Sequence, residues 1–298
     1  MVKEKNPLIS IILLCYRHEK YVAEAVDGVL AQTYSPLDII VVDDCSPDRT
    51  AEIIAAKLAD RPDVRFIRNA KNMTWWGSCE RALNAAQGEF IILSCGDDIM
   101  LPDMVMDMAD VWRGEKVSLV TTNVEYIDEH SNLLGRTARA CDVSADESLE
   151  TLARDGSNAC CFGAAMGFER EVYSTFGLPP AYLGTCDIML PYYAYLLKGA
   201  RFIRKPLLKY RVHGQNTSLS LIAEKSNGVE PMLMQERIFG DHLAHAVLMQ
   251  DELHRLSVRM PSRYPELVTR IDPLITIQIV EIAKKLVRTR VELHKLGR

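Results

Sequence analysis

Two pairs of neighbouring aspartates stand at the ends of short apolar runs. Asp43 and Asp44 follow an Ile-Ile-Val-Val run, and Asp97 and Asp98 follow a Phe-Ile-Ile-Leu run and a short Ser-Cys-Gly segment. Carboxylate oxygens bind hard divalent cations and accept hydrogen bonds from a ribose or a base. Such pairs can hold a metal ion or a nucleotide, although a single pair can equally well cap the helix that follows it.

The apolar runs before these pairs belong to a repeating pattern. Short β-branched runs alternate with helix-like stretches, an order typical of a mostly parallel sheet with helices on both faces. The fold class is therefore α/β. The expected strands span residues 8–14, 38–42, 64–67 and 90–93, and the expected helices span 20–32, 49–58 and 78–87.

The place of the aspartates in this pattern predicts where they meet. In an open parallel sheet, ligands bind beyond the carboxyl ends of the strands. Both pairs stand at such ends, and a polar Cys-Tyr-Arg-His segment, residues 15–18, follows the first strand. We expect the two pairs to face one crevice, where they would repel each other unless a cation lay between them.

Longer motifs surround these aspartates and follow one another along the chain. The first joins Asp43 and Asp44 to a preceding Val-Val and a following Cys-Ser, and the second runs from Glu89 to Pro102. Before them stands Leu30-Ala31-Gln32-Thr33-Tyr34, and after them stand Thr185-Cys186-Asp187-Ile188-Met189-Leu190-Pro191 and Tyr210-Arg211-Val212-His213-Gly214-Gln215-Asn216-Thr217-Ser218. Over roughly residues 7–218, this order resembles that of the inverting glycosyltransferases of family 2.

The resemblance implies a fold and a role for each motif. It implies a GT-A fold for residues 1–220, with a mostly parallel central sheet and flanking helices, followed by a helical extension over 221–298. It also implies Mn²⁺ or Mg²⁺ as cofactor, with Asp44 contacting the nucleotide base. The implied site comprises Leu14, Tyr16, Asp43, Asp44, Trp76 and Asp97 for the nucleotide, Asp97, Asp98 and His213 for the metal, and Asp187 as the general base.

The implied reaction moves a sugar from a UDP-, dTDP- or GDP-sugar to a hydroxyl of a glycan or lipid-linked acceptor, in polysaccharide or O-antigen-type synthesis. A single base without a neighbouring nucleophilic carboxylate favours inversion at the anomeric carbon. A nucleotidyltransferase would need a glycine- and arginine-rich loop after the first strand, and a dehydrogenase a Gly-x-Gly-x-x-Gly segment. Neither segment follows the first strand here.

Met73 replaces a glycine that is usual in the family before Trp75-Trp76, and three further positions depart from the family pattern. Cys95 stands where the metal motif usually begins with Asp, Cys186 replaces the usual Glu, and Tyr193 replaces the usual Arg. A soft thiolate is a poor ligand for Mg²⁺ or Mn²⁺, so we expect the metal on Asp97 rather than on Cys95. The departures also support an alternative function, a catalytically inactive module of the same fold that binds a sugar or a nucleotide.

Several of these residues have a simpler structural interpretation. Asp187 could cap a helix that starts at Ile188, and His213 could be an ordinary loop histidine. The aromatic pair Trp75-Trp76 could belong to the core, or its flat rings could stack on a sugar or a base. These alternatives stay open at the level of the sequence.

Composition excludes other classes of protein. The chain has 298 residues with 35 Lys and Arg against 40 Asp and Glu, a net charge of -5, which argues against a nucleic-acid binder. Its eight cysteines form no Cys-x-x-Cys pair, so we expect reduced thiols. No apolar run reaches the roughly 18 residues that would span a bilayer, and we expect a cytoplasmic location, with the inner face of the plasma membrane as one site of contact.

The end of the chain is predicted to form a basic amphipathic helix that begins at Asp272-Pro273. From Pro273 onward there are six Lys and Arg against two Glu, a net charge of +4. Three interpretations remain open for its apolar stripe: contact with a lipid surface, contact with a second subunit, or packing on its own domain. The stripe comprises Ile275, Ile279, Ile282, Leu286, Leu293 and Leu296.

Overall fold

The computed structural model of the chain describes residues 6–137, 145–155, 163–183, 186–214, 216, 230–260 and 264–295. The chain divides into two units. The first comprises residues 1–142, 160–178 and 196–211, and the second comprises residues 143–159, 179–195 and 212–298. The boundary expected near residue 220 stays a prediction. Several residues of the sequence motifs and stripe lie outside the described part, namely Thr185, Gln215, Thr217, Ser218 and Leu296.

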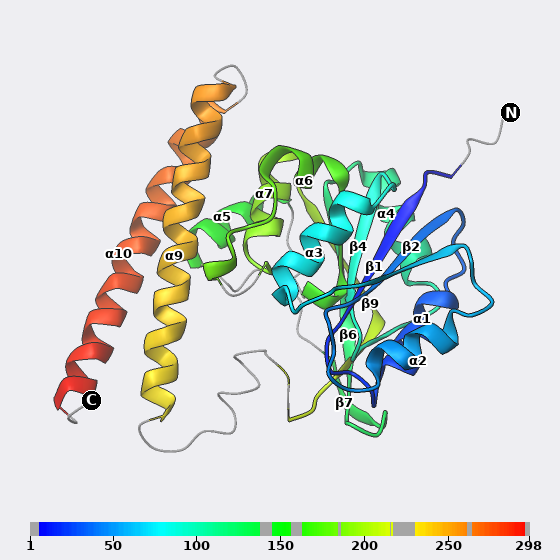
Figure 1. The fold of residues 1–298 in the computed structure, drawn as a ribbon. Helices are drawn as coiled ribbons and strands as arrows, with labels where there is room; N and C mark the ends of the chain where they lie inside the picture. The colour runs from blue at the N-terminus through cyan, green and yellow to red at the C-terminus, as the bar shows by residue number, and fades with distance from the viewer. Residues whose placement is uncertain are drawn as a thin grey trace, which may run out of the picture. The chain divides into compact units, whose positions relative to one another are not determined.

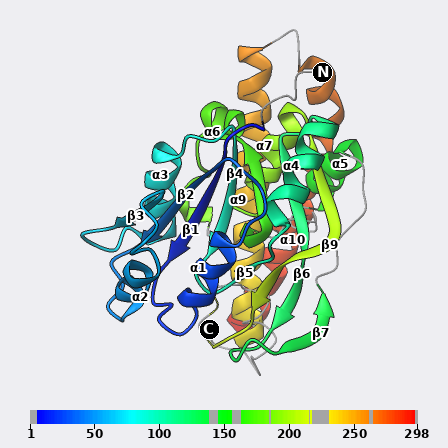
Figure 2. The same cartoon turned by 90° about the vertical axis from the view of Figure 1, so that its right-hand side faces the viewer.

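Four parallel strands form one half of the sheet in the first unit (Figures 1 and 2). β1 (Ile9–Cys15) lies between β2 (Leu37–Asp43) and β4 (Phe90–Cys95), and β3 (Val64–Arg68) pairs with β2. All seven residues of β1 are buried, as expected for a central strand that is covered on both faces. The prediction of an α/β fold with these four strands is confirmed.

The other half of the sheet is mixed. β8 pairs antiparallel with β4 and β6, whereas β9 runs parallel to β6. The full order is β3-β2-β1-β4-β8-β6-β9-β5, and β7 pairs with β6 beside this path. The bounds are β5 (Ile99–Met100), β6 (Leu119–Ile127), β7 (Leu133–Thr137), β8 (Met166–Glu169) and β9 (Ala200–Arg211).

Helices and short 3-10 turns connect these strands. In α1, Val22, Val26 and Val29 follow helical spacing and are buried in the core beneath the sheet. The predicted first and second helices are confirmed, whereas α3 begins four residues before the expected start and therefore includes Trp75 and Trp76 in its first turn. The bounds are α1 (Val22–Leu30), α2 (Thr50–Lys57), α3 (Thr74–Ala85), α4 (Met104–Glu115), η1 (Gly163–Ala165) and α6 (Arg170–Phe176).

The second unit is helical. Its two long helices, α9 (Glu230–Arg259) and α10 (Pro265–Lys295), lie side by side (Figure 1). α10 also contacts α5 (Ala145–Asp155). A 3-10 turn, η2 (Ala181–Leu183), and most of α7 (Met189–Leu197) complete the described part of this unit.

The apolar stripe expected on the last helix is buried against another helix of the same chain. Ile275, Ile282, Leu286 and Leu293 are buried, and α10 packs against α9, which buries Ala246, Met249, Leu253 and Leu256. Of the three interpretations left open by the sequence, packing on its own domain therefore describes this stripe.

The predicted start of this helix is wrong. α10 begins at Pro265, and Pro273 lies inside it. Asp272 Oδ1 accepts a hydrogen bond from Gln250 Nε2 at 2.8 Å and lies 3.1 Å from His254 Nε2, so α9 holds the turn that contains the proline. Packing against a neighbouring helix can outweigh the local preference of a proline for a helix start.

Two further expectations concern the chemistry of the chain. Among the described helices, none combines the length and apolar character that crossing a bilayer requires. No disulfide forms among the described cysteines, which are Cys15, Cys45, Cys79, Cys95 and Cys186.

Candidate active site

The two aspartate pairs lie at the same edge of the sheet, on either side of β1. Cys15 at the end of β1 is in register with Asp43 on β2, and Leu14 is in register with Cys95 on β4. Strands lie about 4.8 Å apart, so the ends of β2 and β4 are separated by about 10 Å. The two pairs therefore do not coordinate the same cation directly, because the end of β1 lies between them.

Asp44 is fixed by hydrogen bonds from the loop before α3. Its Oδ1 accepts from Asn69 Nδ2 at 2.8 Å and from the backbone N–H of Met73 at 2.8 Å. Asn69 is held in turn by Arg81, whose Nη1 donates to Asn69 Oδ1 at 2.6 Å. The carboxylate is 5% exposed and therefore has a single well-defined orientation.

Asp43 shapes the loop that carries Asp44. It is fully buried, and its Oδ2 accepts the N–H of Ser46 at 3.1 Å and lies 3.7 Å from Arg68 Nε. The simpler interpretation of this pair was that it caps the helix that follows. In the structure, Asp48 instead accepts the N–H of Thr50 at the start of α2 through its Oδ1. These contacts of Asp43 shape the loop, and its predicted contact with the nucleotide stays a prediction.

The second pair forms a group that could hold a cation. One ligand atom from each of Cys95, Asp97 and Asp98 lies within 4.8 Å of the other two. Asp97 is half-buried, and its Oδ2 lies 3.8 Å from Nε2 of His18, which follows β1. His18 belongs to the polar segment that follows the first strand, and the sequence motifs assign it no role. Among the described residues, this group is the one with metal-ligand spacing.

A glycine allows the loop to approach β1 this closely. A Cβ on Gly96 would lie 2.6 Å from His18 Nδ1 and 2.7 Å from Cys15 Sγ, well inside van der Waals contact. The N–H of Gly96 donates to Leu14 O at 2.9 Å. A larger residue at position 96 would push the loop away from the end of β1.

Burial makes the charge on Asp98 unfavourable in the apo protein. Its side chain is 2% exposed, and burial, followed by the neighbouring Asp97 carboxylate, raises the pKa of Asp98 well above its ordinary value. At the end of β1, burial and then the charges of Asp43 and Asp97 raise the pKa of Cys15. A bound cation would offset these penalties, and the two carboxylates offer the hard oxygen ligands that Mn²⁺ and Mg²⁺ prefer.

Arg211, at the end of β9, holds this loop from behind. Its backbone N–H donates to Asp98 Oδ1 at 2.9 Å, and its Nε donates to the carbonyl of Asp97 at 2.8 Å. The guanidinium is 1% exposed and also donates to Asp128 O at 3.2 Å, Ser131 Oγ at 2.9 Å and Glu24 Oε2 at 2.6 Å. Sequence reasoning missed this role, although Arg211 stands in the Tyr-Arg motif.

A second missed residue is Gln32, in the motif at the end of α1. Its Nε2 donates to Leu101 O at 2.8 Å, and its Oε1 accepts the N–H of Val105 at 3.0 Å. Gln32 thereby ties the end of α1 to the segment that follows the loop of Asp97 and Asp98. The hydrogen bonds of Gln32 hold the backbone around the site, so we assign this motif residue a structural role.

Backbone strain gathers at this edge of the sheet. Arg17, Cys45 and Thr74 have φ of 60°, 58° and 64°, in the left-handed region that non-glycine residues avoid. Arg17 follows β1, Cys45 follows β2, and Thr74 begins α3. Such residues cost about 1–3 kcal/mol each and persist mainly at functional sites.

The remaining nucleotide-binding candidates differ in exposure. Leu14 is 5% exposed and belongs to the core, whereas Tyr16 is 42% exposed. Trp76 is half-buried and makes an edge-to-face contact with Trp75, with ring centroids 5.0 Å apart. Tyr16 and Trp76 thus present ring surface, whereas the role of Leu14 at a nucleotide stays a prediction.

Asp187 and His213 belong to the second unit. Asp187 precedes α7 by two residues, is half-buried, and its Oδ1 accepts a hydrogen bond from Cys186 Sγ at 3.6 Å. The N–H of His213 donates to the side-chain oxygen of Asn216. Cys186 and Tyr193, which replace family-typical residues, are both buried. The roles of Asp187 and His213 stay predictions.

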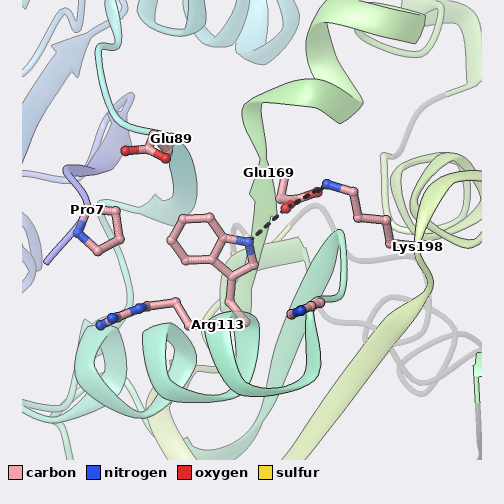
Figure 3. Close-up of a pocket in the computed structure, with 7 residues that line it drawn as sticks. Pro7, Glu89, Arg113, Glu169 and Lys198 are labelled. Atoms are coloured by element: carbon pink, nitrogen blue, oxygen red, sulfur yellow. Dashed lines mark hydrogen bonds and ion pairs between the residues drawn. The ribbon is translucent and has the colours of Figure 1, made fainter. Parts of the chain in front are cut away.

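A cavity of about 630 Å³ lies at the opposite edge of the sheet (Figure 3). Pro7 and Glu89, which precede β1 and β4, line it together with Glu169 and Lys198. Glu169 accepts a hydrogen bond from Trp112 Nε1 at 3.0 Å and pairs with Lys198 at 2.8 Å. Three of its lining residues, Trp112, Glu169 and Lys198, are thus paired with one another, and none of the aspartates described above lines it.

Comparison with known proteins supports the sequence motifs. Residues 10–177 match the sequence model of glycosyl transferase family 2. An uncharacterized glycosyltransferase, alr2836, of Nostoc sp. is 27% identical over 223 residues, which cover 73% of this chain and 69% of that protein. Chondroitin synthase of Escherichia coli is 33% identical over 132 residues, which cover 44% of this chain and 19% of the synthase.

Solved structures share the fold. The mannosyltransferase PcManGT of Pyrobaculum calidifontis, in complex with GDP-Man and Mn²⁺, has a TM-score of 0.59 at 16% identity and covers 99% of this chain and 76% of its own. S. aureus TarS 1–349, in complex with UDP-GlcNAc, has a TM-score of 0.58 at 15% identity and covers 94% and 81%. The expected GT-A fold is confirmed, and the chain belongs to glycosyl transferase family 2.

Proposed function

We propose that this chain is a metal-dependent, inverting glycosyltransferase that moves a hexosyl group from a nucleoside-diphosphate sugar to a hydroxyl of a glycan or lipid-linked acceptor. The observation that carries the proposal is the pairing, at one edge of the sheet, of a pre-oriented acceptor at Asp44 with the acidic group at Asp97 and Asp98. A nucleoside diphosphate presents the complementary pair of features, a base with N–H donors and an anionic diphosphate.

The nucleotide end of the proposal rests on Asp44. Both bonds from Asn69 and Met73 end on Oδ1, so we assign Oδ2 to an N–H of the base. Tyr16 and Trp76 offer ring faces on which a base or a sugar can stack. GDP-Man bound to PcManGT and UDP-GlcNAc bound to TarS support a nucleotide sugar as the ligand class.

The metal end rests on Asp97 and Asp98, with His213 as a further candidate ligand. When bound, Mn²⁺ or Mg²⁺ neutralises charge that develops on the leaving diphosphate. The residues fit such an ion because a buried carboxyl beside a second carboxyl gains from a nearby positive charge. Arg211 holds Asp98 and the Asp97 backbone in place, so the loop needs no rearrangement to receive the ion.

Asp187 is the proposed general base. Deprotonation of the acceptor hydroxyl by one carboxylate, with displacement at the anomeric carbon from the opposite side, gives inversion. The Cys186 thiol donates to Asp187 Oδ1 and helps orient this side chain. A positioned base contributes about 10²–10⁴-fold in rate.

We further propose that the product belongs to a polysaccharide or O-antigen-type glycan and that the enzyme works in the cytoplasm. Local similarity to a chondroitin synthase supports the first point. The alternative function is an inactive sugar- or nucleotide-binding module. It is favoured by Cys95 in the metal-binding group and by the burial of Tyr193, where the family has Arg.

The experiment that tests the proposal separates binding from transfer. Thermal shift with UDP, dTDP and GDP, each with and without Mn²⁺, should show a metal-dependent rise in melting temperature for one base. Release of that nucleotide from its sugar donors is then followed over a panel of hydroxyl acceptors. Asp187→Asn should lower turnover at least 100-fold and keep the thermal shift, whereas the exposed control Asp251→Asn should keep both.

Two results would contradict the proposal. A nucleotide-induced shift without any turnover, identical in Asp187→Asn and the wild type, would favour the inactive module. No shift with any nucleotide would exclude both interpretations.

A further inference from the structure

α10 carries a second apolar stripe, which is independent of the proposed function. Ile277, Val280, Val287 and Val291 are exposed by 56%, 45%, 60% and 48%, respectively. Lys284 fills the gap between Val280 and Val287, so the spacing is three, four, three and four residues. At about 100° per residue, this stripe lies roughly 170° around the helix from the stripe buried against α9.

Single exposed hydrophobic residues are ordinary on a protein surface, but this arrangement is not scattered. The exposed stripe follows the heptad spacing of a coiled-coil seam over about 21 Å of helix, with β-branched residues at four of its five positions. A helix that is apolar on two opposite sides is typical of one that packs on both sides. Within the described part of the second unit, α10 packs against α9 and α5.

The charges beside the stripe select an orientation. Glu281 and Arg288 each follow a seam residue by one position and lie on the same flank. If two copies run antiparallel with Val280 of one opposite Val291 of the other, Glu281 of each copy faces Arg288 of the second copy. A parallel pair would set Glu281 against Thr276 and Arg290 against Lys295, which offers no opposite charges. The antiparallel pair therefore has two complementary contacts related by a two-fold axis.

The same charges disfavour a lipid surface. The exposed stripe and its flanks carry four basic residues, Lys284, Arg288, Arg290 and Lys295, against Glu281 and Glu292. Three of the four are paired within the chain: Lys284 with Glu281 at 2.8 Å, Lys295 with Glu292 at 3.3 Å, and Arg290 with Glu236 of α9 at 2.7 Å. Attraction to anionic lipid depends on unneutralised basic residues, and little such charge remains here.

We infer that a second copy of this chain docks along Ile277, Val280, Lys284, Val287 and Val291 to form an antiparallel, two-fold symmetric pair. The occupant is a second copy because the stripe is complementary to itself: four of its five seam positions are apolar in both copies, and each Glu281 meets an Arg288. Lys284 sits at the centre of the seam and lowers affinity while fixing the register.

Sedimentation velocity of the full chain over a concentration series tests the inference. The wild type should be a dimer at high concentration, and Glu281→Arg or Arg288→Glu should each raise the dimer dissociation constant at least tenfold. Mixing the two variants in equal amounts should restore a heterodimer, because each opposes the other's reversed charge. Lys285→Glu, an exposed charge reversal off the stripe, is the matched control and should leave the dimer intact.

Three results would overturn the inference. These are a monomeric wild type at all concentrations, a dimer unaffected by either charge reversal, and two dissociated variants that stay apart when mixed. Val287→Asp gives a second test of the seam itself, and circular dichroism melting checks that every variant folds. Binding of the wild type to vesicles with anionic lipid, without self-association, would assign the stripe to a membrane surface instead.

Discussion

The two acidic loops that flank β1 look alike in the sequence but are built in different ways. In the first, Asp44 takes two hydrogen bonds from neutral donors on one oxygen, and Asp43 supports the loop beneath it. In the second, Asp97 and Asp98 lie next to each other, and burial and like charge raise the pKa of Asp98 well above its ordinary value. In the first loop the Asp44 carboxylate is held by neutral donors, whereas in the second loop burial and a neighbouring carboxylate disfavour the charge of Asp98.

The difference lies in where the donors come from. Residues 25 and 29 positions along the chain donate to Asp44, whereas Arg211, 113 positions away, donates to Asp98. Arg211 contacts one carboxylate oxygen and one backbone carbonyl of the second loop. The comparison therefore predicts that changes at the second loop act on stability and metal binding, and changes at the first act on nucleotide binding.

Arg211→Met should have the largest effect. The substitution removes the guanidinium that donates to the carbonyls of Asp97 and Asp128. Hydrogen bonds that involve a charged group are worth about 1.5–3 kcal/mol each, so we expect a loss of about 3 kcal/mol or more in the free energy of unfolding. Urea denaturation monitored by circular dichroism measures it. The control, Arg49→Met, removes an exposed pair with Glu52 and should cost less than about 1 kcal/mol. Equal losses in the two variants would show that the second loop does not depend on Arg211.

Asp98→Asn should remove the response to metal. Wild-type protein at about 100 times the Mn²⁺ dissociation constant should gain about 2.7 kcal/mol, measured by thermal unfolding, and Asp98→Asn should gain much less. The exposed control Asp110→Asn should behave as the wild type. An identical gain in Asp98→Asn and the wild type would place the ion elsewhere.

In EDTA, the same variant should change the pH dependence of stability. A carboxyl whose folded-state pKa is raised keeps its proton longer in the native state, so wild-type stability should fall as pH rises above about 4, the unfolded pKa of Asp, until it passes the raised folded value. Asp98→Asn should flatten this fall and be at least as stable as the wild type at pH 7. A steeper fall in the variant would contradict the pKa direction.

Asp44→Asn should weaken nucleotide binding with little change in stability. The amide oxygen can still accept from Asn69 and Met73, but the amide nitrogen that replaces Oδ2 cannot accept from a base. A hydrogen bond to a charged group is worth about 1.5–3 kcal/mol, so we expect at least a tenfold loss of affinity by calorimetry. Asp60→Asn, exposed and distant from the loop, is the control. Unchanged affinity would remove Asp44 from the site.

Cys95→Asp should have the smallest effect and the opposite sign on the metal. A third carboxylate offers Mn²⁺ another hard ligand, so we expect several-fold tighter binding, partly offset by repulsion from Asp97 and Asp98. Cys95→Ser, which adds no charge, should bind Mn²⁺ within about twofold of the wild type. A large loss of Mn²⁺ binding in Cys95→Ser would instead identify the thiol as a ligand.

Local patterns predicted the parallel half of the fold. β1, β2, β3 and β4 are each a short β-branched run bounded by polar residues, and buried parallel strands have this signature. The placement of both aspartate pairs at one edge followed from the same alternation of strands and helices. The mixed half involves pairings between segments far apart in the chain, such as β4 with β8, which periodicity does not report.

The residues that sequence reasoning missed act over long distances. Gln32 and Arg211 each bond to backbone groups that are tens of residues or more away, and a single sequence gives no signal of such contacts. Pro273 was misread for the same reason, since α9 supplies the contacts that keep it inside a helix. The motif that contains Arg211 was found from the sequence, but a role was predicted only for His213 and not for Arg211.

The contact between Arg211 and Asp97 has a consequence for protein synthesis. Their bond joins residues 114 positions apart, so the nascent chain exposes the acidic loop to the cell long before its clamp emerges from the ribosome. Until residue 211 is available, the loop has its contact with β1 but lacks the two hydrogen bonds that Arg211 donates to Asp97 and Asp98. The loop can therefore acquire all of its contacts only after the end of β9 has been translated.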